Sequence, residues 1–184
     1  MALVSVSATL QDAVIDLRYA TENNFTGRPV YARAECWLHE DALEKLIRAA
    51  KLAAEQGLRF RIFDAFRPQE AQRKLWAHTP DPEFLADPAR GSAHSRGVAV
   101  DLTLIGPDGR DLEMGTEFDA FTPLSHHGNT GISPEAQRNR HLLLGIMSSA
   151  GWDFYSNEWW HYQLFNARAR YPLFSDTSLP VPMM

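Results

Sequence analysis

The stretch "GSAHSRGVAVDLTL", Gly91 to Leu104, decides how the fold is interpreted, because it ends in a β-like run. In a strand, successive side chains point to opposite faces of the sheet. One apolar set is therefore expected to face the core, namely Val98, Val100, Leu102 and Leu104. Asp101 then projects from the other face, beside the small Ala99.

His94 lies on the loop that leads into this strand, and Gly97 permits a close backbone turn between them. His94 and Asp101 could therefore reach a single ion. The same spacing also fits two structural hydrogen-bonding residues, so the spacing alone leaves both interpretations open.

Elements before this stretch follow a helix, strand, helix order. Asp41 with Glu44 three residues later resembles a capping box, and apolar residues at helical spacing predict a helix over about 41–56 that ends at Gly57. The segment "LRFRIFDAF" alternates between apolar and other residues, which predicts a strand. A second helix is expected to begin at Arg67-Pro68 and run through "PQEAQRKLWAH".

Elements after this stretch complete the pattern. Ser133-Pro134 predicts the start of a helix that Gly151 closes. The aromatic-rich "EWWHYQLF", residues 158–165, predicts a strand. We therefore expect an α+β fold, in which helices pack on an antiparallel-rich sheet.

The composition is typical of a single globular domain, expected over residues 1–184. With 45% hydrophobic and 22% charged residues and a formal net charge of -5, the chain shows no preference for a polyanion such as nucleic acid. Cys36 is the single cysteine, so a metal ion would have to be held by histidine and carboxylate.

The N-terminal stretch lacks a basic start and a continuous apolar segment, because Asp12 and Asp16 interrupt it. No part of the chain approaches the roughly 18 consecutive apolar residues of a membrane helix. A soluble, cytoplasmic protein is expected, with no membrane partner. A periplasmic protein whose leader had been removed would look the same.

A third ligand for the ion must come from elsewhere, and His161 in "NEWWHYQ" is the best candidate among the seven histidines. A hydrolytic zinc site needs three protein ligands, one open position and a general base, and Glu158 could be that base. Since residues three apart on a regular strand point to opposite faces, Glu158 should lie in a turn or bulge where the strand begins. Two histidines and a carboxylate also occur in non-haem iron oxygenases.

The segment "SAHSRGVAVD", residues 92–101, is similar to the S-x-H-x-x-G-x-A-x-D signature of the zinc D,D-peptidase family, peptidase M15, and "EWWH" is similar to its second signature. Further similar segments occur in order along nearly the whole chain: "DLRYATENNFTG", "DAFRPQEAQ", "MGTEFD", "SHH" and "EAQRNR". The chain resembles the VanX-type D-alanyl-D-alanine dipeptidases within that family.

The resemblance implies the Hedgehog/D,D-peptidase fold, a central antiparallel sheet flanked by helices, with one Zn²⁺ per chain. It also implies roles for eight residues: zinc ligands His94, Asp101 and His161; catalytic base Glu158; Arg67 for the charge on the scissile carbonyl oxygen; Asp119 for the substrate ammonium; and Ser92 and Tyr19 lining the dipeptide pocket. A guanidinium suits the role of Arg67, since it stays cationic and offers a fork of donors.

The implied activity is hydrolysis of the free dipeptide D-alanyl-D-alanine, so the expected partner is a small dipeptide. Two other functions stay open: a D,D- or L,D-carboxypeptidase acting on peptidoglycan stem peptides, and a zinc-stabilised binding module. The sequence leaves open the oligomeric state, the range of dipeptides and the choice among nutrient salvage, wall recycling and glycopeptide resistance.

Overall fold

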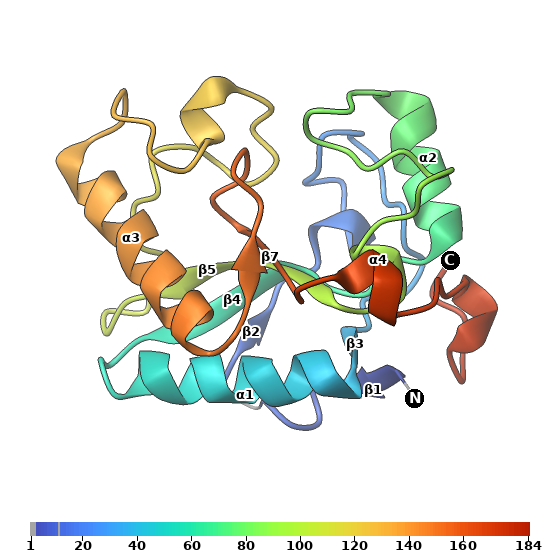
Figure 1. Cartoon of the computed structure of the whole chain (residues 1–184), viewed down its shortest axis with the longest axis horizontal. Coiled ribbons are helices and arrows are strands. Elements are labelled where there is room, and N and C mark those ends of the chain that lie inside the picture. The colour runs from blue at the N-terminus through green and yellow to red at the C-terminus, as the bar shows by residue number, and fades with distance from the viewer. Residues whose placement is uncertain (1–2, 11) are drawn as a thin grey trace.

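The computed structural model describes residues 3–10 and 12–184, and its central feature is a five-stranded sheet (Figure 1). The strands lie in the order β2 (Val14–Ile15), β4 (Arg59–Asp64), β5 (Ala99–Ile105), β7 (His161–Gln163) and β6 (Asp153–Phe154). Only β2 pairs in parallel, with β4. Strands β1 (Leu3–Ser5) and β3 (Trp37–His39) form a separate antiparallel pair.

The expected α+β class with an antiparallel-rich sheet is confirmed. The parallel strand β2 was not predicted, because two residues are too few to show an alternating pattern.

Helices α1 (Glu40–Ala54) and α3 (Pro134–Ser149) contact each other and the sheet, as Figure 1 shows. Helix α2 (Gln69–His78) lies on the opposite side of the sheet in this view. The shorter elements are α4 (Ala167–Arg170) and the 3-10 turns Arg18–Ala20, His94–Arg96, Pro123–Ser125 and Asp176–Ser178. Ser133 caps α3 as expected, since its Oγ accepts a hydrogen bond from the Ala136 N–H.

The expected cap of α1 was wrong. The helix begins at Glu40, one residue before the predicted start, and His39 is the capping residue. The His39 Nδ1 accepts a hydrogen bond from the Asp41 N–H at 3.1 Å, so the ring satisfies the donor that the capping box would have served. The helical segment ends before Gly57, whose φ of 71° is left-handed, as predicted.

Alternation from Val98, directly before β5, along the strand places the expected apolar side chains in the main hydrophobic core, as predicted: Val98, Val100, Leu102 and Leu104. The predicted strand over 158–165 was too long, because residues 158–160 form a turn. In that turn the Trp159 N–H bonds to the Ser125 carbonyl, not to a neighbouring strand. Within the described part of the chain, none of the helices combines the length and apolarity that crossing a membrane would require.

Candidate metal centre and active site

Register across three strands brings chemically active side chains into one row. Asp101 on β5 is the direct partner of His161 on β7. Asp64 on β4 is paired with Asp101 from the other side, after a register shift between Ile62 and Asp64. Directly opposed residues of antiparallel strands project from the same face, so the three side chains stand next to one another.

His94 reaches this row from the turn that precedes β5. The turn, His94–Arg96, ends at Gly97, whose φ is 68°. A Cβ on Gly97 would come within 2.5 Å of the Leu3 side chain and 3.1 Å of the His39 nitrogen. Glycine is therefore required here on both conformational and steric grounds, and the close turn places His94 over the sheet.

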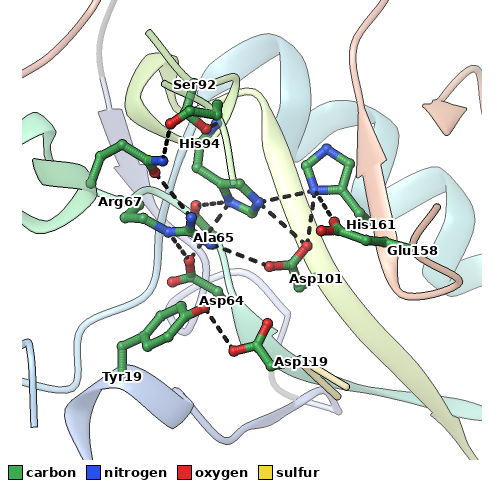
Figure 2. Close-up of polar contacts among 12 residues, drawn as sticks. Tyr19, Asp64, Ala65, Arg67, Ser92, His94, Asp101, Asp119, Glu158 and His161 are labelled. Carbon is green, nitrogen blue, oxygen red and sulfur yellow. Dashed lines mark hydrogen bonds and ion pairs between the residues drawn. The ribbon is translucent and has the colours of Figure 1, made fainter. Parts of the chain in front are cut away.

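The side chains of His94, Asp101 and His161 converge on a common point (Figure 2). The His94 Nε2 lies 3.1 Å from the His161 Nδ1 and 3.3 Å from the Asp101 Oδ1. The third side of the triangle, from His161 Nδ1 to Asp101 Oδ1, is 3.1 Å. The three residues are buried.

Hydrogen bonds on the outer side of the two imidazole rings indicate which ring nitrogen carries the proton. The His94 Nδ1 lies 2.7 Å from the Ala65 carbonyl oxygen, which only accepts, so this nitrogen carries the proton. The His161 Nε2 lies 3.1 Å from the Gln163 Oε1, which assigns its proton in the same way. Both inner nitrogens therefore present lone pairs to the centre, as in metal-ligating histidines.

The three donors fit a small divalent cation. A tetrahedral zinc ion with bonds of about 2.0–2.1 Å separates its ligand atoms by roughly 3.3 Å, close to the sides of the triangle described above. Two lone pairs and a carboxylate oxygen at such distances repel one another unless a cation lies among them.

Glu158 lies beside this triangle, in the turn that precedes β7, as its spacing from His161 predicted. Its Oε2 is 3.7 Å from the His161 Nδ1, and no hydrogen bond from the described residues reaches the carboxylate. Burial raises the pKa of Glu158 well above its usual range, and the nearby Asp101 and Asp119 add to that effect. An uncoordinated carboxylate with a raised pKa is suited to accept and release a proton.

Arg67 approaches the same centre from the segment between β4 and α2. Its Nε donates to the Asp64 Oδ2 at 2.8 Å and its Nη1 donates to the Gln72 Oε1 at 3.0 Å. The Nη2 lies 3.6 Å from the Asp101 Oδ2. The guanidinium also lies 5.0 Å from the centre of the Tyr19 ring, so it is fixed from several sides.

Asp119, Tyr19 and Ser92 complete the surroundings. The Tyr19 hydroxyl donates to the Asp119 Oδ2 at 2.8 Å, and burial together with the Asp101 carboxylate raises the pKa of Asp119 to about 8. The backbone of Asp119 has a φ of 58°, which is uncommon for a residue with a Cβ. The Ser92 Oγ accepts a hydrogen bond from the His94 N–H at 3.1 Å.

A cavity of about 530 Å³ joins these groups. Its lining includes all eight residues that the sequence singled out: Tyr19, Arg67, Ser92, His94, Asp101, Asp119, Glu158 and His161. The structure thus places them around one cavity, which Glu158 and Asp119 line together with the group that could hold a metal ion.

Several supporting residues were not predicted. Gln163 had a usable signal, because it follows His161 by two positions and so shares its face of the strand. Gln72 had none, since a hydrogen bond to Arg67 is not implied by a spacing of five. The Tyr31 hydroxyl donates to the Asp64 Oδ1 from 33 positions away, and the Ala65 carbonyl belongs to the backbone, so the sequence marks neither contact.

A buried group of two histidines and one carboxylate, beside an uncoordinated glutamate in a cavity, is the arrangement of a metal-dependent hydrolase. The family model of peptidase M15, described as D-ala-D-ala dipeptidase, matches residues 1–179. The chain belongs to this peptidase family, and it is an enzyme.

Relatives with similar sequences carry the name D-alanyl-D-alanine dipeptidase. The Escherichia coli protein is 44% identical over 174 residues, which cover 95% of this chain and 90% of that protein. An Enterococcus faecium protein is 37% identical, with 81% of this chain and 84% of that protein covered. A Streptomyces coelicolor protein is 33% identical over the same shares of the two chains.

Proposed function

We propose that the protein hydrolyses the free dipeptide D-alanyl-D-alanine to two D-alanine molecules, with one bound Zn²⁺. The observation that carries the proposal is the convergence of the His94, Asp101 and His161 ligand atoms beside Glu158 in one cavity. The names of the relatives support the choice of substrate.

The metal would be held by the His94 Nε2, the His161 Nδ1 and the Asp101 carboxylate, the atoms that face one another. When bound, zinc supplies a Lewis acid that polarises a carbonyl group and lowers the pKa of a water molecule to about 7. The imidazole protons on the outer side are already engaged by Ala65 and Gln163, so the ligand set is preorganised.

Glu158 moves the proton. Its carboxylate takes a proton from the attacking water and later delivers it to the nitrogen of the leaving amine. The position of Glu158 3.7 Å from the His161 Nδ1 places it next to the group that would hold the ion, and without hydrogen bonds from the described residues it is free to exchange the proton.

Arg67 and Asp119 act on the charges of the substrate. The Arg67 Nη2 donates to the carbonyl oxygen as negative charge develops there, while Asp64 and Gln72 hold the rest of the guanidinium. Asp119 meets the substrate ammonium, so an acylated amine would leave its carboxylate without a partner. Ser92 and Tyr19 shape the pocket around the dipeptide.

The test combines a substrate panel with the variant Glu158→Ala. The wild-type enzyme should hydrolyse D-alanyl-D-alanine and lose this activity with a chelator, whereas N-acetyl-D-alanyl-D-alanine should react poorly. Glu158→Ala should keep its zinc and lose turnover by about three or more orders of magnitude, because the proton transfer is removed. The control Glu44→Ala changes an exposed carboxylate on α1 and should keep full activity.

Three results would contradict the proposal. Comparable turnover of the N-acetylated dipeptide would instead indicate a carboxypeptidase that acts on longer stem peptides. A Glu158→Ala variant that keeps turnover would remove Glu158 as the base, and a requirement for iron in place of zinc would indicate oxygenase chemistry.

A further inference from the structure

One wall of the active-site cavity is a short segment, Pro82–Ala86, which we call the wall segment. It lies in the connection between the end of α2 at His78 and the turn that begins at His94. Its backbone hydrogen bonds are local, from the N–H groups of Phe84 and Leu85 to the Asp81 carbonyl. No strand ladder holds it, so side chains must determine its position.

The C-terminal end of the wall segment is anchored. Leu85 is buried in a second hydrophobic core that contains Tyr19 and Leu75. The Ala86 carbonyl accepts a hydrogen bond from the Gln72 Nε2 at 2.7 Å. The tip of the segment, Glu83 and Phe84, lies outside this anchor and lines the cavity.

Contacts with Tyr155, His126 and Phe121 join this tip to other parts of the chain, and of these three residues Tyr155 lines the cavity. The Tyr155 hydroxyl donates to the Glu83 carbonyl oxygen at 2.8 Å. The His126 Nε2 lies 3.3 Å from the Glu83 Oε1. The Phe84 ring stacks on Phe121, with ring centres 5.0 Å apart and an interplanar angle of 7°.

Tyr155 lies next to the proposed reacting groups. Its ring centre is 6.3 Å from that of His161, it lies three residues before Glu158, and it lines the cavity. The Asn157 Nδ2 donates to the Tyr155 hydroxyl at 3.3 Å, which orients the hydroxyl. One side chain thus connects the turn that carries Glu158 with the tip of the wall segment.

We propose that Tyr155 is a specificity-determining residue, which keeps the wall segment closed over the cavity and so restricts the site to peptides of two residues. The inference rests on the proposed function and adds to it a second determinant of peptide length, independent of Asp119. On this proposal the tip occupies the space that a third residue would enter, so a tripeptide would bind only after the tip contacts break, whereas a dipeptide would bind with these contacts intact.

The test compares Tyr155→Phe with wild type on D-alanyl-D-alanine and on D-alanyl-D-alanyl-D-alanine. When the tripeptide is cut at its first peptide bond, its free ammonium lies next to the scissile carbonyl as in the dipeptide, so Asp119 meets the same group in both substrates and the third residue extends on the carboxyl side. Loss of the hydroxyl should raise the ratio of kcat/KM for the tripeptide to that for the dipeptide about three- to tenfold, through a lower KM for the tripeptide. The variant Phe84→Leu breaks the ring stack from the other side and should shift the ratio in the same direction.

Tyr171→Phe is the matched control. The Tyr171 hydroxyl donates to the Asp41 Oδ2 at 2.7 Å, a bond of similar length to that of Tyr155, but on helix α1. In Tyr171→Phe, the ratio of kcat/KM for the tripeptide to that for the dipeptide should equal the wild-type ratio. Hydrogen–deuterium exchange should also be faster at residues 82–86 in Tyr155→Phe, and unchanged there in Tyr171→Phe.

The possible failures are distinguishable. An unchanged ratio in both Tyr155→Phe and Phe84→Leu, with unchanged exchange at residues 82–86, would overturn this inference and leave the proposed function intact. A wild-type enzyme that does not hydrolyse the dipeptide would overturn the proposed function, and this inference with it.

Discussion

Arg67 shows at the scale of one residue how the site is organised. Its guanidinium uses Nε for Asp64 and Nη1 for Gln72, which leaves Nη2 toward the cavity. Only a forked, planar cation can satisfy two buried acceptors and still leave a third donor free. The side chain is therefore specified by geometry as well as by charge.

The variant Arg67→Lys should lower kcat about 10²- to 10³-fold while the zinc content stays the same, because an ammonium keeps the charge near Asp64 but cannot serve all three directions. Steady-state kinetics and metal analysis check this. Arg61→Lys is the control. The Arg61 Nε lies 2.9 Å from the Asp111 Oδ1, and Arg61 does not line the cavity, so this variant should have the kcat of wild type. Equal loss in both variants would contradict the role of Arg67.

Residues with a characteristic chemistry and spacing were predictable from the sequence. The positions of His94, Asp101 and His161 at one cavity agree with that expectation. Their outer contacts were not predictable in full, because the Ala65 partner is a backbone carbonyl, which any residue type would supply.

At the scale of elements, the turn between His94 and β5 determines where the first imidazole lies. Gly97 adopts a φ of 68° and its carbonyl accepts a hydrogen bond from the His39 N–H at 2.7 Å. The turn therefore packs directly on β3, and the position of one ligand depends on a contact with a distant strand.

The variant Gly97→Ala should have a lower free energy of unfolding than wild type. The loss should exceed the roughly 1–2 kcal/mol that a left-handed conformation costs a residue with a Cβ, since the added Cβ also meets Leu3 and the His39 backbone. It should also bind zinc more weakly, because the turn must shift. Gly27→Ala is the matched control, as Gly27 has a φ of 66° and an open surrounding. Chemical denaturation and zinc titration of both variants check this; equal losses would contradict it.

Elements with a periodic pattern were predicted well, and their ends were predicted less well. Helix α1 starts at Glu40 because the His39 ring caps it, which is an unusual residue for that role. Strand β7 is limited to His161–Gln163 because the preceding residues bond to the Ser125 and Tyr155 carbonyls. Both ends depend on tertiary contacts that a local pattern does not contain.

At the scale of the whole molecule, the three proposed metal ligands come from parts of the chain that are far apart. His94 and His161 are separated by 67 positions, and their nitrogen atoms are 3.1 Å apart. A bound ion would therefore link β5 and its preceding turn to β7. A metal ion that binds these ligands only where the folded chain brings them together favours the folded state by mass action.

The expected single domain over residues 1–184 and the expected cytoplasmic location both stay predictions.

Chelation should lower Tm by about 5–10 °C, compared with enzyme at a free zinc concentration of about 100 Kd. Zinc at that concentration adds about 2.7 kcal/mol to the free energy of unfolding. For a chain of this length, each kcal/mol corresponds to about 2–4 °C in Tm. Calorimetry with and without chelator measures the shift. The variant His161→Ala, which lacks one ligand, should show a much smaller response. A wild-type Tm that is insensitive to chelator would contradict a metal ion at this site.

On the proposed function, three ligand atoms from His94, Asp101 and His161 hold one zinc ion, with Glu158 uncoordinated beside it. Anomalous diffraction at the zinc absorption edge, from crystals of the zinc-loaded enzyme, tests this most directly. We expect one peak per chain, about 2.0–2.2 Å from the ligand atoms of His94, Asp101 and His161 and farther from the Glu158 carboxylate. A peak at another site, or no peak between the two imidazoles, would contradict it.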